Sequence, residues 1–204
     1  MIYLRNIHLL GAVCMLGLFI SGTIPAQEET AAGHEYFTSV NLWREKGKEI
    51  FSTNYHVGEI IPVGTPVRIL KNESGRIEFS TDTDKKCTIV HVTRHSRIGF
   101  DALFNRLFTK ADVLAPGGLF HKLTMKEKKA VADGTIIPGM SRKAVIMAFG
   151  YPPSHKTPDL EGGTWIYWLS RWRTVTVVFN ESDSVQSVKG LPEKASRTEG
   201  KKQK

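Results

Sequence analysis

The chain has 204 residues, a formal net charge of +8 and two cysteines, Cys14 and Cys87. Its length suits one large domain or two small ones. Cys14 lies in an apolar N-terminal run that export would remove, which would leave Cys87 as the only cysteine. An internal disulfide is then excluded, so the stability of the fold must come from apolar cores.

The first 26 residues are predicted to be a cleaved signal peptide. Arg5 precedes an apolar run, Ile7 to Ile24, that contains no Asp, Glu, Lys or Arg, and small residues then lead to a cleavage position at Ala26. The run is also long enough to span a bilayer as an uncleaved anchor, and this alternative stays open. The residues before Cys14 form a poor lipobox, so a lipid anchor is not expected. We therefore expect a periplasmic or secreted protein, for which nucleic acid is not an expected partner.

Residues 27–35 are predicted to be a flexible polar lead, and residues 36–98 a β domain. Short apolar runs alternate with turn residues there and show no helical period. Many short strands at this spacing are typical of a small barrel or sandwich. The predicted strands are Phe37 to Leu42, Glu49 to Ser52, Pro66 to Lys71, Arg76 to Ser80 and Cys87 to Val92.

Residues 99–119 are predicted to contain a helix and a linker. Apolar residues three and four positions apart form one stripe between Phe100 and Lys110. The sequence Ala-Pro-Gly-Gly at 115–118 then interrupts regular structure. The domain boundary is expected in this segment, and the sequence does not say to which domain the helix belongs.

Residues 120–190 are predicted to form two helices followed by three strands. Thr124 and Glu127 have the spacing of a capping box that opens a helix through about Asp133. Ser141 is the predicted N-cap of the second helix, and Gly150 its C-cap. The predicted strands are Thr164 to Leu169, Arg173 to Asn180 and Ser184 to Lys189.

The faces of the first two of these strands depend on the turn between them. If the turn consists of Ser170 and Arg171, Leu169 lies opposite Trp172 and one face packs on the two helices. A turn of three residues would reverse the faces of one strand. With the shorter turn, the face toward the helices carries Ile166, Trp168, Val175, Val177 and Phe179.

The opposite face, with Trp165, Tyr167, Leu169 and Trp172, is the predicted partner-binding surface. Exposed apolar patches mark interaction sites, and Trp and Tyr are favoured interface anchors. These side chains would be equally well buried against the N-terminal domain or the helix that begins at Phe100. Both interpretations stay open.

Two motifs of the second domain resemble the SmpA/OmlA (BamE-like) family. Gly-Met-Ser at 139–141 opens the second helix, Phe-Gly-Tyr-Pro-Pro at 149–153 closes it, and aromatic-rich strands follow. The resemblance covers about residues 120–190. It implies a fold of two helices and three strands in an envelope protein that supports outer-membrane protein assembly. The chain differs from the family's lipoproteins by its missing lipobox and its added N-terminal β region.

The stretch from Ile60 to Ile69, Ile-Ile-Pro-Val-Gly-Thr-Pro-Val-Arg-Ile, resembles a bacterial SH3-like domain. The resemblance covers about residues 36–98. It implies a small β barrel, and domains of this kind often bind cell-wall peptides or other proteins.

Cys87 and His91 are the residues that best suggest chemistry. Four positions apart in a strand, they would share one face, with His95 nearby. A zinc site needs further ligands at suitable spacing, and a cysteine nucleophile is often activated at a helix N-terminus, which a strand does not offer. The sequence also contains no HExxH, GxSxG, Walker or GxGxxG motif. No catalytic residue, metal or cofactor is therefore expected.

The sequence as a whole predicts an α+β protein, with an SH3-like β barrel followed by a BamE-like ααβββ domain. Residues 191–204 form a basic tail, predicted to be disordered, for which contact with an anionic membrane or the cell wall is the alternative. The predicted function is non-enzymatic binding of an envelope protein, with a link to outer-membrane biogenesis. Peptidoglycan binding and a metal- or thiol-dependent enzyme are the alternatives. No small-molecule substrate is evident.

Overall fold

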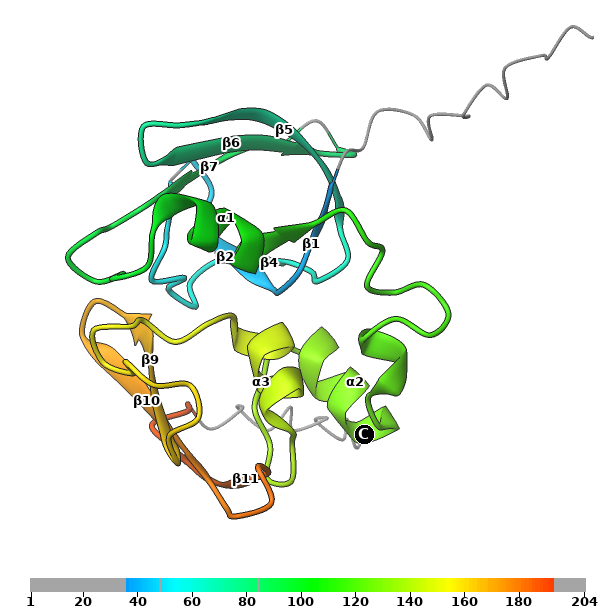
Figure 1. The fold of residues 1–204 in the computed structure, drawn as a ribbon, viewed down its shortest axis with the longest axis vertical. Coiled ribbons are helices and arrows are strands. Elements are labelled where there is room, and N and C mark those ends of the chain that lie inside the picture. Colours follow the sequence, from blue (N-terminus) through cyan, green and yellow to red (C-terminus); the bar gives the residue numbers. More distant parts are fainter. Residues whose placement is uncertain (1–35, 48, 84, 193–204) are drawn as a thin grey trace, which may run out of the picture. The chain divides into compact units, whose positions relative to one another are not determined.

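The computed structural model describes residues 36–47, 49–83 and 85–192, which form an α+β protein (Figure 1). They belong to one compact unit with two hydrophobic cores. We call residues 36–109 the first lobe and residues 120–192 the second lobe. The predicted signal peptide, the predicted lead over 27–35 and residues 193–204 of the predicted tail lie outside the described residues.

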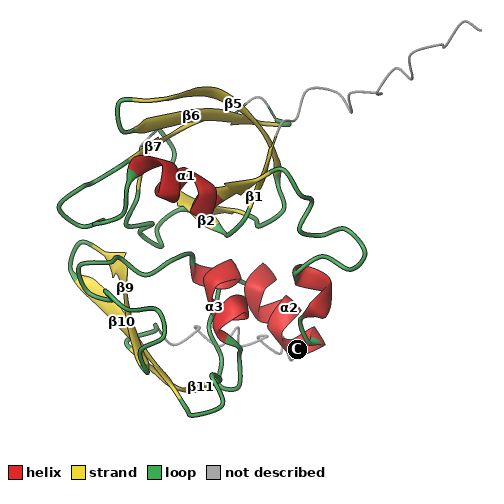
Figure 2. Cartoon of the chain, viewed as in Figure 1, coloured by secondary structure: helices red, strands yellow, loops and turns green. Residues whose placement is uncertain are grey.

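The first lobe is built on a six-stranded sheet in the order β3-β7-β6-β5-β1-β8. Strands β1, β5, β6 and β7 of this sheet are labelled in Figure 2. Its neighbouring strands are antiparallel except for β3 and β7, which are parallel. Strands β2 and β4 form a separate antiparallel pair. The strands are β1 (Tyr36–Thr38), β2 (Leu42–Arg44), β3 (Ile50–Phe51), β4 (Glu59–Ile61), β5 (Pro66–Glu73), β6 (Arg76–Thr81), β7 (Lys86–Val90) and β8 (Phe108–Thr109).

Alternation of side chains explains how β6 and β7 build the first core. Every second residue of these strands points inward, because successive side chains of a strand lie on opposite faces of the sheet. The inward residues are Ile77, Phe79, Cys87 and Ile89, and all four are buried.

The first predicted strand, Phe37 to Leu42, is wrong in its middle, since the chain bends between β1 and β2. The backbone N–H of Ser39 donates to Leu107 O at 2.8 Å, and that of Asn41 donates to Met147 O at 2.9 Å. These bonds to two helices replace the ladder of a continuous strand.

Helix α1 (Phe100–Leu107) belongs to the first lobe. Leu103 and Leu107, one turn apart, are buried in the first core. The chain then becomes extended at Phe108 and enters the sheet as β8, where it pairs with β1. The helix therefore ends earlier than the predicted Lys110.

The second lobe contains two α-helices and a three-stranded antiparallel sheet in the order β11-β10-β9. The predicted N-cap is confirmed, since Ser141 Oγ accepts a hydrogen bond from Ala144 N at 3.3 Å. Gly150 ends α3 with a φ of 77°, a left-handed conformation that favours glycine. The elements are the 3-10 helix η1 (Phe120–Lys122), α2 (Met125–Ala132), α3 (Arg142–Phe149), β9 (Thr164–Ser170), β10 (Arg173–Phe179) and β11 (Val185–Lys189).

Glu127 joins the beginnings of α2 and α3. The predicted capping box is confirmed: Glu127 N donates to Thr124 Oγ1 at 3.2 Å, and Thr124 N donates to Glu127 Oε2 at 2.8 Å. The other carboxylate oxygen accepts from Ser141 N at 2.9 Å and Ser141 Oγ at 2.8 Å. Burial alone would raise the pKa of Glu127, but the hydrogen bonds from Ser141 and Thr124 outweigh it and lower the pKa.

The predicted inward face of β10, with Val175, Val177 and Phe179, is confirmed, whereas the predicted face of β9 is reversed by a one-residue register shift next to the turn. The turn consists of Arg171 and Trp172, so Ser170 pairs with Arg173, and a register shift follows between Arg173 and Thr174. A one-residue difference in register moves side chains to the other face of a sheet. The buried face therefore carries Trp165, Tyr167, Leu169, Val175, Val177 and Phe179.

Asn41 connects the first lobe to both helices of the second. Its Nδ2 donates to Val131 O at 2.7 Å and to Ala148 O at 3.2 Å, and its Oδ1 accepts from Val63 N at 2.8 Å. The residue is 1% exposed. The last carbonyls of a helix lack hydrogen-bond donors within the helix. Asn41 of the first lobe donates to one such carbonyl in α2 and to one in α3.

Asn54 and His56 complete the connection at the end of α3. Phe149 O accepts from Asn54 Nδ2 at 3.2 Å and lies 3.1 Å from His56 Nε2, which must donate because a carbonyl can only accept. Asn54 Oδ1 also accepts from Trp43 N at 3.1 Å. The two lobes are therefore joined by buried hydrogen bonds as well as by apolar contacts.

No helix in the described part of the chain is long and apolar enough to cross a membrane.

Candidate binding site

The predicted aromatic binding surface does not exist as one face. Trp165 and Tyr167 are each 1% exposed and Leu169 is 8% exposed, all within the second core. Tyr167 Oη donates to Gly150 O at 3.1 Å, and Trp165 Nε1 donates to Leu160 O at 3.1 Å. Three of the four predicted residues are thus structural, and only Trp172, in the turn, is exposed.

Cys87 and His91 contact different parts of the first lobe. The Cys87 thiol lies 3.6 Å from Arg44 Nη1, and burial raises its pKa despite this neighbouring cation. His91 follows the end of β7 and stacks on Phe100, with ring centroids 6.1 Å apart. A thiol whose pKa is raised is a weak nucleophile at neutral pH.

His95 contacts the second lobe rather than Cys87. Its ring centroid lies 4.7 Å from that of His155, and His155 Nδ1 donates to His95 O at 3.0 Å. Burial lowers the pKa of His95, and the neighbouring His155 and Arg94 add to this. Within the residues that the structure describes, no group of three or more His, Cys, Asp or Glu side chains is arranged to hold a metal ion.

A cleft of about 560 Å³ lies between α1, the segment after β8, and α3. We call it the basic cleft. Its volume is within the range of protein sites that bind ligands. It is lined by Ser39, Val40, Asn105, Arg106, Thr109, Ala111, Asp112, Val113, Gly117, Gly118, Leu119, Lys122, Lys143, Ile146, Met147 and Tyr151.

The helices present one face each to the basic cleft and bury the other. Lys143, Ile146 and Met147 are three and four positions apart on α3, so they share one face. The opposite face, with Ala144, Val145 and Ala148, is fully buried in the second core. Helix α1 is arranged in the same way: Leu103 and Leu107 are buried in the first core, whereas Asn105 and Arg106 line the cleft. The position of the cleft wall therefore follows from which helix faces the two cores require.

The segment between β8 and η1 forms the remaining wall through a tight turn. Asp112 Oδ1 accepts from Leu114 N at 2.8 Å, and Gly118 N donates to Ala115 O at 2.8 Å. A Cβ atom at Gly118 would lie 2.6 Å from Val113 O, so only glycine fits there. The turn brings Val113 and Leu119 to the cleft.

The floor of the basic cleft is apolar and its rim is cationic. Val40, Val113 and Met147 are buried, whereas Lys122 and Lys143 are exposed. The third cation, Arg106, lies over the ring of Tyr151, with its guanidinium 4.6 Å from the ring centroid. No carboxylate among the described residues forms an ion pair with any of the three cations.

These features fit an anionic ligand that also carries apolar groups. Unpaired cations around a low-dielectric surface raise the local concentration of anions. The only carboxylate in the wall is Asp112, and its Oδ1 is engaged by the turn. Apolar side chains of a ligand would gain contact with the floor.

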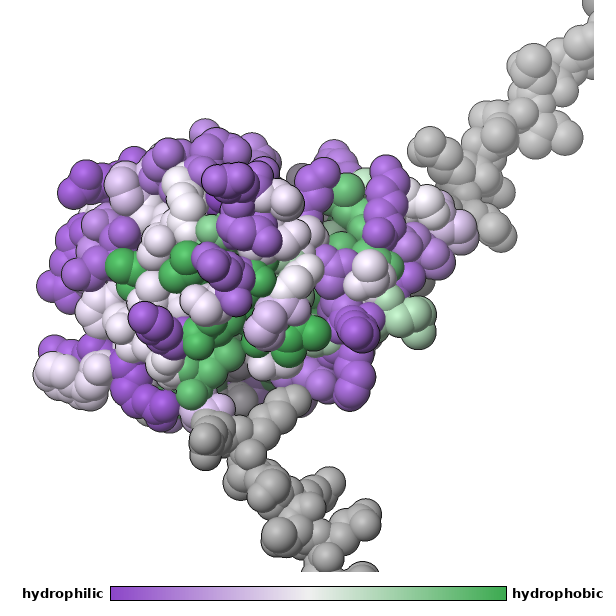
Figure 3. Space-filling model, turned by 90° about the horizontal axis from the view of Figure 1, so that it is seen from below, coloured by the Kyte–Doolittle hydropathy of each residue, from purple (hydrophilic) through white to green (hydrophobic). Residues whose placement is uncertain are grey.

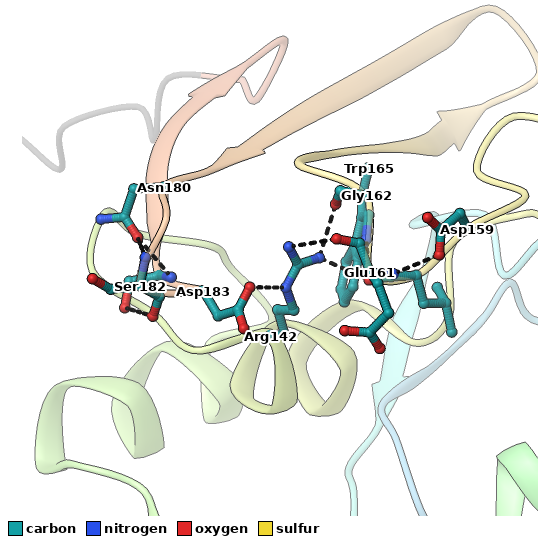
Figure 4. Close-up of polar contacts among 10 residues, drawn as sticks. Arg142, Asp159, Glu161, Gly162, Trp165, Asn180, Ser182 and Asp183 are labelled. Carbon is teal, nitrogen blue, oxygen red and sulfur yellow. Dashed lines mark hydrogen bonds and ion pairs between the residues drawn. The ribbon is translucent and has the colours of Figure 1, made fainter.

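Arg142, in the first turn of α3, is engaged in holding two loops together (Figure 4). Its Nε donates to Asp183 Oδ1 at 2.8 Å, in the turn before β11. Its Nη1 donates to Leu160 O at 2.7 Å and Gly162 O at 2.9 Å, in the loop before β9. The guanidinium also lies 4.3 Å over the ring of Phe179. These contacts use most of its donors, so Arg142 acts as a structural clamp.

The basic cleft was not found from the sequence because its parts come from separate segments. The spacing of Lys143, Ile146 and Met147 is a readable signal for one helix face. Nothing in the sequence places Arg106 or Lys122 opposite that face. Asn41 and Asn54 were missed as well, since Asn41 lies within the predicted strand Phe37 to Leu42 and Asn54 follows a predicted strand, where an asparagine is typical of a turn.

Comparison of the chain with models of protein families, with curated proteins and with solved structures gave no match.

Proposed function

We propose that the chain is a non-enzymatic cell-envelope protein that binds an acidic, partly apolar segment of a partner protein in the basic cleft. The observation that carries the proposal is a group of three cations around an apolar floor, Arg106, Lys122 and Lys143, none of which forms an ion pair with a described carboxylate. Electrostatic complementarity of this kind favours encounter with an acidic partner and sets its orientation.

The rim of the basic cleft favours a peptide over a small molecule. Leu119 is 49% exposed, so the apolar surface continues beyond the enclosed volume. An extended peptide supplies carboxylates and apolar side chains alternately along such a surface. The described residues that line the cleft include no histidine or cysteine, which supports binding rather than catalysis.

The proposal includes the identity of the two lobes. We propose that the first lobe is an SH3-like β domain and the second a BamE-like ααβββ domain. The order of two helices and three antiparallel strands between Met125 and Lys189 supports the second assignment, as does the Gly-Met-Ser motif before α3. The link to outer-membrane assembly comes from this resemblance alone.

The test uses the protein after export and removal of its leader, with a fluorescent peptide that alternates Glu and Leu as the probe. We expect this peptide to bind, and a peptide that alternates Lys and Leu not to bind. Replacing Arg106→Glu together with Lys143→Glu should weaken binding by roughly tenfold or more, because attraction becomes repulsion. The matched control replaces Lys86→Glu and Lys126→Glu, two exposed cations outside the cleft.

Two results would contradict the proposal. One is equal binding of both peptides by the unchanged protein. The other is an equal loss of affinity in the cleft variant and in the control, because a general effect of net charge would then explain the binding.

A further inference from the structure

The turn between β9 and β10 carries the most exposed aromatic side chain of the described residues. Trp172 is 85% exposed, whereas Trp43 and Trp165 are buried. Figure 3 looks from below onto the second lobe and shows apolar side chains in a broken band between polar ones. Trp172 differs from these apolar side chains because it lies at the tip of the hairpin that β9 and β10 form. A tryptophan in this position leaves a large apolar ring in water.

Arginines flank Trp172 on both sides. Arg171 and Arg173 are exposed, and the guanidinium of Arg171 lies 5.3 Å from the centre of the indole. No described carboxylate forms an ion pair with either arginine. The tip therefore combines one indole with two cations whose charges are not balanced locally.

The last described residues of the chain lie beside this hairpin. Arg173, Leu191 and Pro192 line the same cavity of about 290 Å³, so the C-terminal segment begins next to the hairpin. The sequence that follows contains two acidic residues, Glu193 and Glu199. It contains more basic residues, namely Lys194, Arg197, Lys201, Lys202 and Lys204. The described part of the chain thus ends at Pro192, which lines the same cavity as Arg173 of the hairpin.

We propose that this hairpin tip docks on an anionic lipid surface. The indole of Trp172 would lie at the level of the headgroups, where an amphipathic ring has both apolar and polar neighbours. Arg171 and Arg173 would contact phosphate groups, which suit the planar donors of a guanidinium. This surface is separate from the basic cleft, so the inference goes beyond the proposed function.

The experiment measures sedimentation of the exported, leader-free chain with vesicles. Vesicles of phosphatidylglycerol mixed with phosphatidylethanolamine should bind the protein, and vesicles of phosphatidylcholine should not. Replacing Arg171→Gln and Arg173→Gln should weaken binding by about fivefold for each charge, the usual effect of one basic residue near an anionic surface. Trp172→Ser should weaken binding by about fivefold or more, because the indole no longer enters the interface.

The matched control is Met125→Ser, which removes an apolar side chain that is 79% exposed on α2. We expect this variant to bind vesicles as the unchanged protein does. Circular dichroism should be the same for all variants, since the altered side chains are exposed.

Three outcomes would overturn the inference. The first is that the unchanged protein does not sediment with anionic vesicles. The second is that the Trp172 and arginine variants bind as tightly as the unchanged protein, with all affinity lost on truncation after Pro192, which would assign binding to the basic segment alone. The third is that Met125→Ser weakens binding as much as Trp172→Ser, which would indicate a nonspecific apolar effect.

Discussion

His56 is a residue whose chemistry depends on its position between the lobes. Its ring lies between those of Trp43 and Phe149, with centroids 4.1 Å away in both cases. Burial lowers its pKa to about 4, and the hydrogen bond to Phe149 O opposes this only in part. Because Nε2 donates that bond, Nδ1 is left buried without a hydrogen-bond partner among the described residues. A proton on Nδ1 would bring an uncompensated charge into this contact.

We expect His56 to make stability depend on pH. In the unfolded chain the imidazole binds a proton below its ordinary pKa of about 6.5, whereas the folded chain resists protonation down to about 4. The folded state therefore loses stability as the pH falls from 6.5 to 4, by about 3 kcal/mol from this residue. Urea unfolding between pH 7 and 4.5 would measure the slope, and His56→Phe should reduce it.

Part of the pH dependence should remain in His56→Phe, because burial also lowers the pKa of His95. His95 therefore also destabilises the folded state as the pH falls. The control is His121→Gln, an exposed residue outside the contact between the lobes. A pH-independent stability in the unchanged protein, or an unchanged slope in His56→Phe, would contradict this account.

At the scale of elements, the hydrogen bonds at helix ends and the inward face of β10 were readable from the sequence, whereas the inward face of β9 was not. The helix signals at Thr124, Ser141 and Gly150 are local, because each depends on residues a few positions away. The face that β9 turns toward the helices depends on the register shift between Arg173 and Thr174, which pairs Thr174 with Trp168. Such a choice is made by the packing of whole side chains, which the sequence pattern does not contain.

The junction between α2 and α3 gives a prediction at this scale. Glu127→Gln should lower the free energy of unfolding by about 2 kcal/mol, because an amide offers one acceptor oxygen where the carboxylate accepts from both Thr124 and Ser141. Chemical unfolding at pH 7 would measure the loss. Lys126→Gln, exposed on the same helix, is the control and should change stability by less than about 0.5 kcal/mol. Equal stability of the two variants would show that the carboxylate is not needed at this junction.

At the scale of the whole molecule, the basic cleft and the hairpin tip depend on how the lobes are joined. The cleft takes one wall from α1 and another from α3, and the first lobe holds the end of α3 through Asn41, Asn54 and His56. The separate β and ααβββ regions were visible in the sequence as a change of pattern. Their connection was not visible, because no periodicity marks a buried asparagine that reaches across a domain boundary.

The connection predicts that the two lobes unfold together. Asn41→Ala should lower the free energy of unfolding by about 3 kcal/mol, since Val63 N loses its acceptor and the carbonyls of Val131 and Ala148 each lose one donor. The unchanged protein should unfold in one transition, seen alike by tryptophan fluorescence and circular dichroism. Asn72→Ala, exposed in β5, is the control and should have little effect. Separate transitions in the unchanged protein would contradict this coupling.

Asn41 and Asn54 of the first lobe cap the end of α3, so the second lobe depends on residues that lie far away in the sequence. A fragment that starts after residue 110 would keep every helix and strand of the second lobe, yet it would leave the terminal carbonyls of α3 without their natural donors. Recombination that replaces one lobe by that of a distant relative would lose the same hydrogen bonds unless Asn41, Asn54 and α3 are kept together. We therefore expect the two lobes to be inherited together.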